Sequence, residues 1–166
     1  MNVDGLKLDF FLVMPLGKAA KSKGGQYGAE LTKILHTMVY EIAKEIKPDC
    51  LINSSPAHPY FDEVCDQARL HDCSWETRDQ CARMTERAEI FSAALPGVLI
   101  DTDTTNYASH SEAMRYLRHQ PKIGIPDIYQ FSNSCHITLT DEDWREIEKI
   151  FNDYSDEMDK LFEDKN

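Results

Sequence analysis

A regular alternation between short apolar runs and longer segments of helical periodicity constrains the fold of this chain more than any other feature. Residues 4–11 form the first apolar run, and after a loop rich in Gly and Lys, apolar side chains recur every three or four positions over residues 31–46. Strands that alternate with helices pair in parallel through right-handed crossovers. The chain is therefore predicted to be an α/β protein with a parallel sheet. The pattern repeats downstream, with strands expected at 50–53, 68–72, 98–100 and 127–131 and helices at 75–95, 109–119 and from 140 onward.

Capping residues and apolar stripes define the predicted helices. The first helix ends before Pro48, Ser109 or Ser111 begins a later one, and Thr140 begins the last. Residues 60–65 are expected to form a single helical turn, and the tail 160–166 is expected to fray. The buried stripe of the first helix is predicted to consist of Leu31, Ile34, Leu35, Met38, Val39, Ile42 and Ile46. That of the last helix is predicted to consist of Trp144, Ile147, Ile150, Phe151, Tyr154 and Met158.

Two architectures satisfy a succession of parallel strands: an open, doubly wound sheet and a closed (β/α)8 TIM barrel. Polar residues at consecutive strand ends are typical of a barrel mouth, whereas an open sheet gathers its ligands at one switch point. Because a complete barrel takes about 250 residues, this chain of 166 residues is predicted to supply about strands four to eight of one. An open parallel α/β sheet is the alternative. The strand-end residues in question are Asp9, Asn53, Ser54, Asp72, Asp101, Asp103, Ser132 and Asn133.

Composition argues against several classes of protein. Residues 1–166 are predicted to form a single domain, and the net charge of −11 argues against nucleic acid or an anionic membrane as a partner. The five cysteines are scattered without the spacing of a metal site, which favours reduced thiols, a cytoplasmic location and no metal. Residues 17–28 contain no nucleotide-binding glycine motif, and the apolar stretch 10–16 is too short to cross a bilayer. No cofactor is predicted.

Two charges interrupt the first apolar run. In a strand, Lys7 and Asp9 share one face while Leu6, Leu8 and Phe10 share the other. Burying such charges is costly unless they are partnered. One interpretation is an edge strand with one wet face, or a structural ion pair. The other is a catalytic carboxylate at the carboxyl end of a barrel strand, which the neighbouring lysine keeps ionised.

Two short motifs resemble those of a known group of enzymes. Residues 4–10, Asp-Gly-Leu-Lys-Leu-Asp-Phe, resemble the fourth-strand motif of the retaining α-glycosidases in glycoside hydrolase families 27, 31 and 36, in which Lys-x-Asp carries the catalytic nucleophile. Residues 69–72, Arg-Leu-His-Asp, resemble the Arg-x-x-Asp on the sixth strand of the α-galactosidase group, in which the aspartate is the general acid/base. The resemblance covers nearly the whole chain and implies the C-terminal part of a TIM-barrel catalytic domain. It also implies a carbohydrate substrate, and either self-association or a complementary N-terminal half-barrel as partner.

The resemblance gives the catalytic roles to Asp9 as nucleophile and Asp72 as acid/base. Hydrolysis of an α-linked sugar with retention needs a nucleophile on one side and a proton donor on the other, with the two carboxyl groups about 5 Å apart. Lys7 is expected to favour the ionised form of Asp9. Burial near Trp75 is expected to raise the pKa of Asp72, so that this group is protonated when it acts. Arg69 is expected to bind sugar hydroxyls or to steady Asp72.

Three further residues are candidates for substrate binding. Asp101 and Asp103 are expected to bind sugar hydroxyls or a metal, although Asp-Thr-Asp at a strand end is also common turn chemistry. His58, in a loop that contains prolines, either lines the site or is simply solvated. His36 lies beside the apolar stripe of its helix and is predicted to be structural.

An alternative function belongs to a different class. In an open sheet, the strand-end Asp9 would bind Mg²⁺ or accept a phosphoryl group, as part of a binding or signalling module. A non-catalytic remnant that keeps only the scaffold is a third interpretation. Binding of a sugar or iminosugar would favour the glycosidase, whereas stabilisation of the fold by Mg²⁺ would favour the binding or signalling module.

Overall fold

The computed structural model describes residues 3–9, 22–55, 58–72, 79–103, 107, 109–128 and 137–163. The chain divides into two compact units. The first unit comprises Met1–Leu70 and Ala88–Asp101, and the second comprises His71–Arg87 and Thr102–Asn166. The sheet belongs to the first unit, and the helices near the C-terminus belong to the second.

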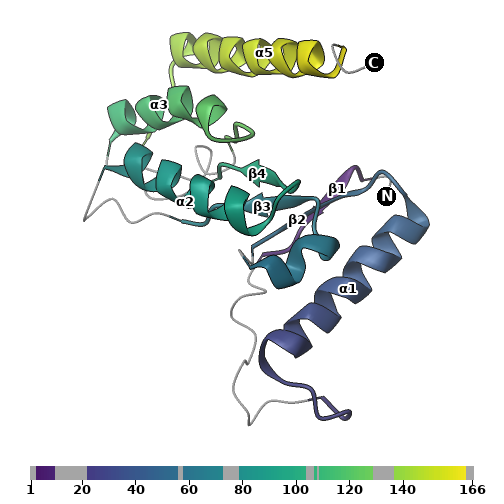
Figure 1. Ribbon diagram of the computed structural model, residues 1–166. Coiled ribbons are helices and arrows are strands. Elements are labelled where there is room, and N and C mark those ends of the chain that lie inside the picture. The colour runs from purple at the N-terminus through teal and green to yellow at the C-terminus, as the bar shows by residue number, and fades with distance from the viewer. Residues whose placement is uncertain are drawn as a thin grey trace. The chain divides into compact units, whose positions relative to one another are not determined.

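A four-stranded parallel sheet forms the centre of the first unit (Figure 1). Each strand pairs with the next one along the chain, in the order β1-β2-β3-β4. Backbone hydrogen bonds continue this ladder beyond the strand ends, from Leu8 N to Asn53 O (2.8 Å) and from Leu70 N to Asp101 O (3.0 Å). The predicted α/β class with a parallel sheet is therefore confirmed. The strands are β1 (Gly5–Lys7), β2 (Leu51–Ser54), β3 (Gln67–Arg69) and β4 (Leu99–Asp101).

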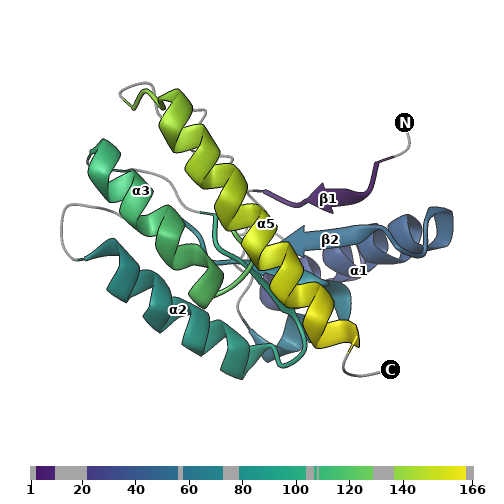
Figure 2. The ribbon, with the colours of Figure 1, turned by 90° about the horizontal axis from the view of Figure 1, so that it is seen from above.

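Helix α1 (Gly28–Ile46) packs on one face of this sheet (Figures 1 and 2). A 3-10 helix, η2 (Pro59–Val64), follows β2 in the segment where a single helical turn is predicted. Helix α2 (Gln80–Ala94) leads from β3 into β4. The core between α1 and the sheet consists of Leu8, Ala43, Cys50 and Ile52, with Val39 and Tyr40 packed against them.

The side of α1 that is buried differs from the predicted one. Its buried residues are Thr32, His36 and Ala43. Because His36 is hydrogen-bonded to Ser54 at the end of β2 (2.6 Å), the sheet contact runs along this row and the predicted apolar row turns partly to solvent. The exposed fractions are 37% for Ile34, 53% for Met38, 54% for Ile42 and 80% for Ile46.

The second unit contains α3 (His110–His119), the 3-10 helix η3 (Gln120–Lys122) and α5 (Asp141–Glu163), with α3 and α5 side by side (Figure 2). Ser109 caps α3 by accepting a hydrogen bond from Glu112 N (3.3 Å), as predicted for one of two candidate serines. Thr140 and Asp143 cap α5 reciprocally: Asp143 N donates to Thr140 Oγ1 (3.2 Å), and Thr140 N donates to Asp143 Oδ2 (2.7 Å). The helix continues past Lys160 as far as Glu163.

Aromatic and aliphatic side chains fill the core of the second unit. In the predicted stripe of α5, Ile147 is buried, whereas Trp144 is 46% exposed. Within the described ranges, no helix has the length and hydropathy needed to span a membrane. The core includes Met84, Tyr107, Ala113, Met114, Tyr116, Leu117 and Ile137.

The fifth strand predicted at 127–131 is wrong for its described residues. Asp127 and Ile128 are not in a strand. The side chain of Gln120 holds the backbone of Asp127 instead, with Gln120 Nε2 donating to Asp127 O (3.0 Å) and Asp127 N donating to Gln120 Oε1 (3.2 Å). A side chain thus satisfies the donor and acceptor that a ladder would use. Residues 129–131 lie outside the described part of the chain.

Candidate functional site

One face of the sheet is polar. In a parallel ladder, residues that are Cα partners point to the same face. Lys7 pairs with Asn53, and Asn53 pairs on its other side with Gln67. Arg69 follows Gln67 by two positions and pairs with Asp101, so these two also lie on this face. The opposite face carries Leu6, Ile52, Ser54, Ala68 and Ile100, while Leu51 and Leu99 lie on the polar face at the amino ends of their strands.

The carboxyl end of the polar face holds a buried carboxylate and its amide donor. Asp101 is 3% exposed at the end of β4, and Asn53 is 8% exposed near the end of β2. Asn53 Nδ2 donates a hydrogen bond to Asp101 Oδ2 at 2.5 Å. Because β3 separates these two strands, the contact links side chains above an intervening strand. This end of the face is therefore a preformed polar surface.

Asp9 lies beside a cation at the same end of the sheet. Arg69 Nη1 is 3.7 Å from Asp9 Oδ1, so the guanidinium on β3 reaches past β2 to the carboxylate that follows β1. The Arg69 side chain is 9% exposed, whereas that of Asp9 is 53% exposed. This geometry combines a buried positive charge with a carboxylate that solvent, and hence a ligand, can reach.

Asn53 also presents an acceptor to this face. Its Oδ1 atom is buried and has no hydrogen-bond partner among the described residues. A buried amide oxygen left in this state costs about 1–3 kcal/mol. A hydroxyl group of a bound ligand could donate to it, because hydroxyls carry one donor hydrogen each.

The other predicted site residues fall into two groups. Lys7 lies on the polar face in β1 and is exposed. Asp72 and Asp103 belong to the second unit, where Asp72 is exposed and Asp103 is 1% exposed. The backbone carbonyls of His71 and Asp72 both accept hydrogen bonds from Arg87 Nη1, at 3.0 and 2.9 Å. His71 has φ of +69°, so the extended backbone of β3 is interrupted before Asp72. Trp75, expected to bury Asp72, lies outside the described residues.

Both histidines named from the sequence have structural contacts. His58 caps η2, since its Nδ1 accepts a hydrogen bond from Tyr60 N (3.0 Å). His36 Nδ1 bonds to Thr32 O (2.9 Å), and because a carbonyl only accepts, this nitrogen carries the proton. Nε2 therefore accepts from the Ser54 hydroxyl (2.6 Å). Burial lowers the pKa of His36, which favours this neutral form.

Sequence reasoning did not place two features among the site residues. Asn53 and Gln67 were not assigned to the site, although their alternation with apolar neighbours is the same signal that singled out Lys7. A second cluster, around Cys81 in the second unit, was also missed. Its signal is the spacing of basic residues along α3, which usually marks a solvated helix face.

Comparisons with protein-family models, with curated proteins and with solved structures find no match for this chain. In the part of the chain that the structure describes, no group of three or more His, Cys, Asp and Glu side chains is arranged to hold a metal ion. The geometry of the polar face and the two short motifs are therefore the features of this chain that bear on its function.

Proposed function

We propose that this chain is the carboxyl-terminal part of a (β/α)8 barrel whose polar face hydrolyses α-linked sugars with retention. The observation that carries the proposal is the sheet: four parallel strands in strict sequence order, with polar side chains on one face at their carboxyl ends. Every strand of a barrel pairs with its sequence neighbour, whereas a doubly wound sheet reverses its order at a switch point. Four consecutive neighbours without a reversal support the barrel.

The chemistry of the polar face suits a ligand rich in hydroxyl groups. Asn53 offers an acceptor, Arg69 offers guanidinium donors, and Asp101 offers carboxylate oxygens, and all three are largely buried on one face. Sugar hydroxyls both donate and accept hydrogen bonds, so a mixed set of donors and acceptors can bind them. Burial of these groups holds their positions, which favours binding without reorganisation.

In this proposal Asp9 is the nucleophile. Its half-exposed carboxylate can attack the anomeric carbon and form a glycosyl ester. The resemblance of residues 69–72 assigns to Asp72 the proton that the departing glycosidic oxygen needs, and then the activation of the water that hydrolyses the ester. The separation of 3.7 Å between Arg69 Nη1 and Asp9 Oδ1 exceeds hydrogen-bond length, so this oxygen is not engaged in a short bond to that nitrogen.

The same contact disfavours the alternative function. A divalent cation at Asp9 would lie close to the guanidinium of Arg69, and like charges at such short range repel. A binding or signalling module that uses Mg²⁺ at Asp9 would have to move this side chain away. The sugar hypothesis needs no such displacement.

Covalent trapping tests the proposal directly. An α-configured carbohydrate epoxide, which esterifies the nucleophile of retaining α-glycosidases, is incubated with the full chain, and the modified residue is located by peptide mass spectrometry. We expect the label on Asp9, loss of labelling in Asp9→Asn, and unchanged labelling in Asp49→Asn. Asp49 is a matched control because it is exposed in the turn after α1. Labelling that persists in Asp9→Asn, or that is absent from the wild type, would contradict the proposal.

A further inference from the structure

A cavity in the second unit is lined mainly by basic side chains. Its volume is about 300 Å³, and it is lined by Cys81 of α2 together with Arg115, Arg118, His119 and Lys122. The last four residues recur at three- and four-residue spacing along α3 and η3, so they lie on one side of that segment. In a chain with net charge −11, such a concentration of basic side chains is unusual. The volume is at the lower end of the range for small-molecule sites, about 300–1,000 Å³.

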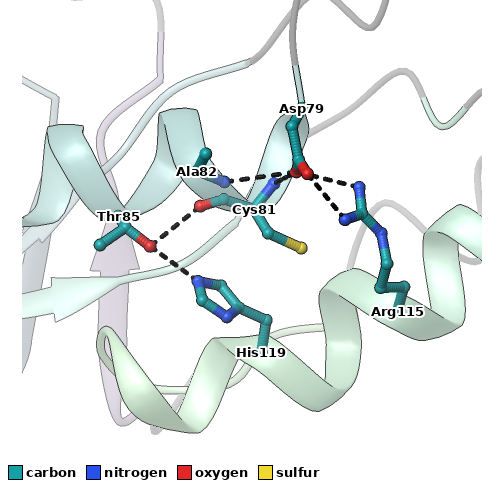
Figure 3. Close-up of polar contacts among 6 residues, drawn as sticks. All are labelled: Asp79, Cys81, Ala82, Thr85, Arg115 and His119. Atoms are coloured by element: carbon teal, nitrogen blue, oxygen red, sulfur yellow. Dashed lines mark hydrogen bonds and ion pairs between the residues drawn. The ribbon is translucent and has the colours of Figure 1, made fainter.

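Both arginines are held in place by carboxylates. Arg115 Nη1 and Nη2 donate to Asp79 Oδ2 and Oδ1 at 2.9 and 3.0 Å (Figure 3). Arg118 Nε and Nη2 donate to Glu146 at 2.5 and 2.8 Å. A guanidinium has five N–H donors, and a bidentate carboxylate uses two of them. Each arginine therefore keeps donors for a ligand while its position is fixed.

Backbone N–H groups at the start of α2 already have an acceptor, so the donors that this cavity offers to a ligand are side chains. Asp79 Oδ1 accepts hydrogen bonds from Cys81 N (2.9 Å) and Ala82 N (3.4 Å), which caps the first turn of α2 (Figure 3). The same carboxylate thus closes the helix and orients Arg115. A further polar group, the amide of Gln80, lies beside Cys81 in the chain; it is 3% exposed, and neither Nε2 nor Oε1 has a hydrogen-bond partner within the described residues.

His119 contributes an oriented neutral ring. Thr85 Oγ1 donates to Cys81 O (2.9 Å), so the His119 Nε2 atom, 2.8 Å from that hydroxyl, donates to it (Figure 3). Burial is the main cause that lowers the pKa of His119, and the charges of Lys122 and Arg115 lower it further.

Lys122 is the cation with the most freedom. It is exposed and makes no ion pair with any described residue, whereas Arg115 and Arg118 each have one carboxylate partner. The carboxylates that act on the lining residues are Asp79, Glu112, Glu146 and Asp143, and the first two oppose ionisation of the Cys81 thiol. The paired arginines offer oriented guanidinium groups with unused N–H donors. Lys122 adds a positive charge that makes no ion pair with a carboxylate of the described residues.

We propose that this cavity binds a tetrahedral oxyanion, phosphate or sulfate, either free or as the ester of a small molecule. Fixed guanidinium groups are suited to such anions because their planar N–H donors match pairs of oxyanion oxygens. Lys122 adds the positive charge of its ammonium group to the same site. The site is separate from the polar face of the sheet and does not depend on its proposed function.

Titration calorimetry with the full chain tests the binding. Inorganic phosphate, sulfate and glycerol 3-phosphate are compared at constant ionic strength set with chloride. We expect saturable binding that Lys122→Met weakens about tenfold, the effect of losing one hydrogen bond to a charged group. Lys160→Met is the matched control, because Lys160 is an exposed lysine of the same unit outside the cavity. Tighter binding of glycerol 3-phosphate would identify an ester ligand, and equal binding a free anion; both results support the oxyanion site.

Thiol alkylation gives the location. Cys81 lines the cavity, whereas Cys65 lies outside it; burial raises the pKa of both thiols, that of Cys65 to about 11. We expect saturating phosphate to slow iodoacetamide alkylation of Cys81, measured by peptide mass spectrometry, in the wild type and in Lys160→Met but much less in Lys122→Met. Equal phosphate affinity in Lys122→Met and the wild type, or alkylation of Cys81 that phosphate does not change, would overturn the proposal.

Discussion

The hydrogen bond between Asn53 and Asp101 can be tested by replacing its amide donor with a second carboxylate. Asn53→Asp replaces the Nδ2 donor with a carboxylate oxygen about 2.5 Å from Asp101 Oδ2, at a position where Asp101 is 3% exposed. Two unit charges at that separation repel by about 7 kcal/mol at an effective dielectric constant near 20. The pair would instead share one proton. Keeping a carboxyl group of ordinary pKa protonated at pH 7 costs about 4 kcal/mol, which sets the expected loss of stability.

The pH dependence distinguishes this mechanism from simple loss of packing. Since the cost is that of binding one proton, it should fall by about 1.4 kcal/mol for each pH unit below 7 and become small near pH 4. Urea unfolding of wild type and variant, followed by far-ultraviolet circular dichroism at several pH values, measures the difference. The swap Asn53→Asp/Asp101→Asn restores one amide and one carboxylate, and should regain most of the stability at pH 7. A pH-independent loss, or a swap no more stable than the single variant, would refute the reasoning.

Further predictions concern the proposed reaction, the start of α5 and the exposed face of α1. Asp72→Asn should slow hydrolysis of substrates with poor leaving groups far more than that of activated aryl glycosides, and azide should rescue it with retained configuration; inverted product in product analysis would exclude double displacement. Thr140→Ala should cost about 1 kcal/mol in urea unfolding through loss of the α5 cap, whereas a loss below the error of the measurement would contradict that role. The Thr140 backbone N–H, His110 and the Thr140 hydroxyl hold the pKa of Asp143 at about 2, below the ordinary 3.8, so its contribution is complete above about pH 4 and disappears as the pH falls through 2. The stability difference between wild type and Asp143→Asn, followed over that range, should shrink accordingly. Finally, self-association through the exposed row of α1 should be weakened by Ile42→Glu in sedimentation velocity, and a wild type that is monomeric at all concentrations would contradict it.

Local signals in the sequence were sufficient for the elements and their direction. The caps at Ser109 and Thr140 follow from short-range hydrogen bonding, and the parallel sheet follows from strand–helix alternation. The polar face also follows from the sequence, because alternation with a period of two places Lys7 on one side of β1 and Leu6 on the other. Each of these features depends on residues that are only a few positions apart in the sequence.

Features set by distant partners could not be predicted in this way. The sequence suggested Lys7 as the cation for Asp9, because the two residues share one face of the strand. The structure places Arg69 against Asp9, from a strand two positions away in the sheet. The fifth strand is a similar case, since Gln120 competes for the backbone of Asp127 from outside the segment.

The rotation of α1 also depended on a distant residue. An apolar stripe predicts which side of an isolated helix is hydrophobic, yet the bond between His36 and Ser54 aligns a different row with the sheet. The basic residues of α3 also depend on distant partners. In the sequence Arg115 and Arg118 are indistinguishable from ordinary solvated charges, and only the structure shows that Asp79 and Glu146 bind them.

The burial of charge on the polar face can itself be used as a test of function. A buried carboxylate with its donor contributes little net stability, and replacing both partners by apolar groups of similar shape is often neutral or stabilising. Asn53→Leu alone leaves Asp101 with one hydrogen bond fewer and should cost about 1.5–3 kcal/mol. Asn53→Leu/Asp101→Leu should recover most of that loss in urea unfolding and still fail to bind sugar. The contrary result would be a double variant whose loss of unfolding free energy exceeds the summed losses of Asn53→Leu and Asp101→Leu. The pair would then be needed for folding, and its polarity would give no support to a ligand site.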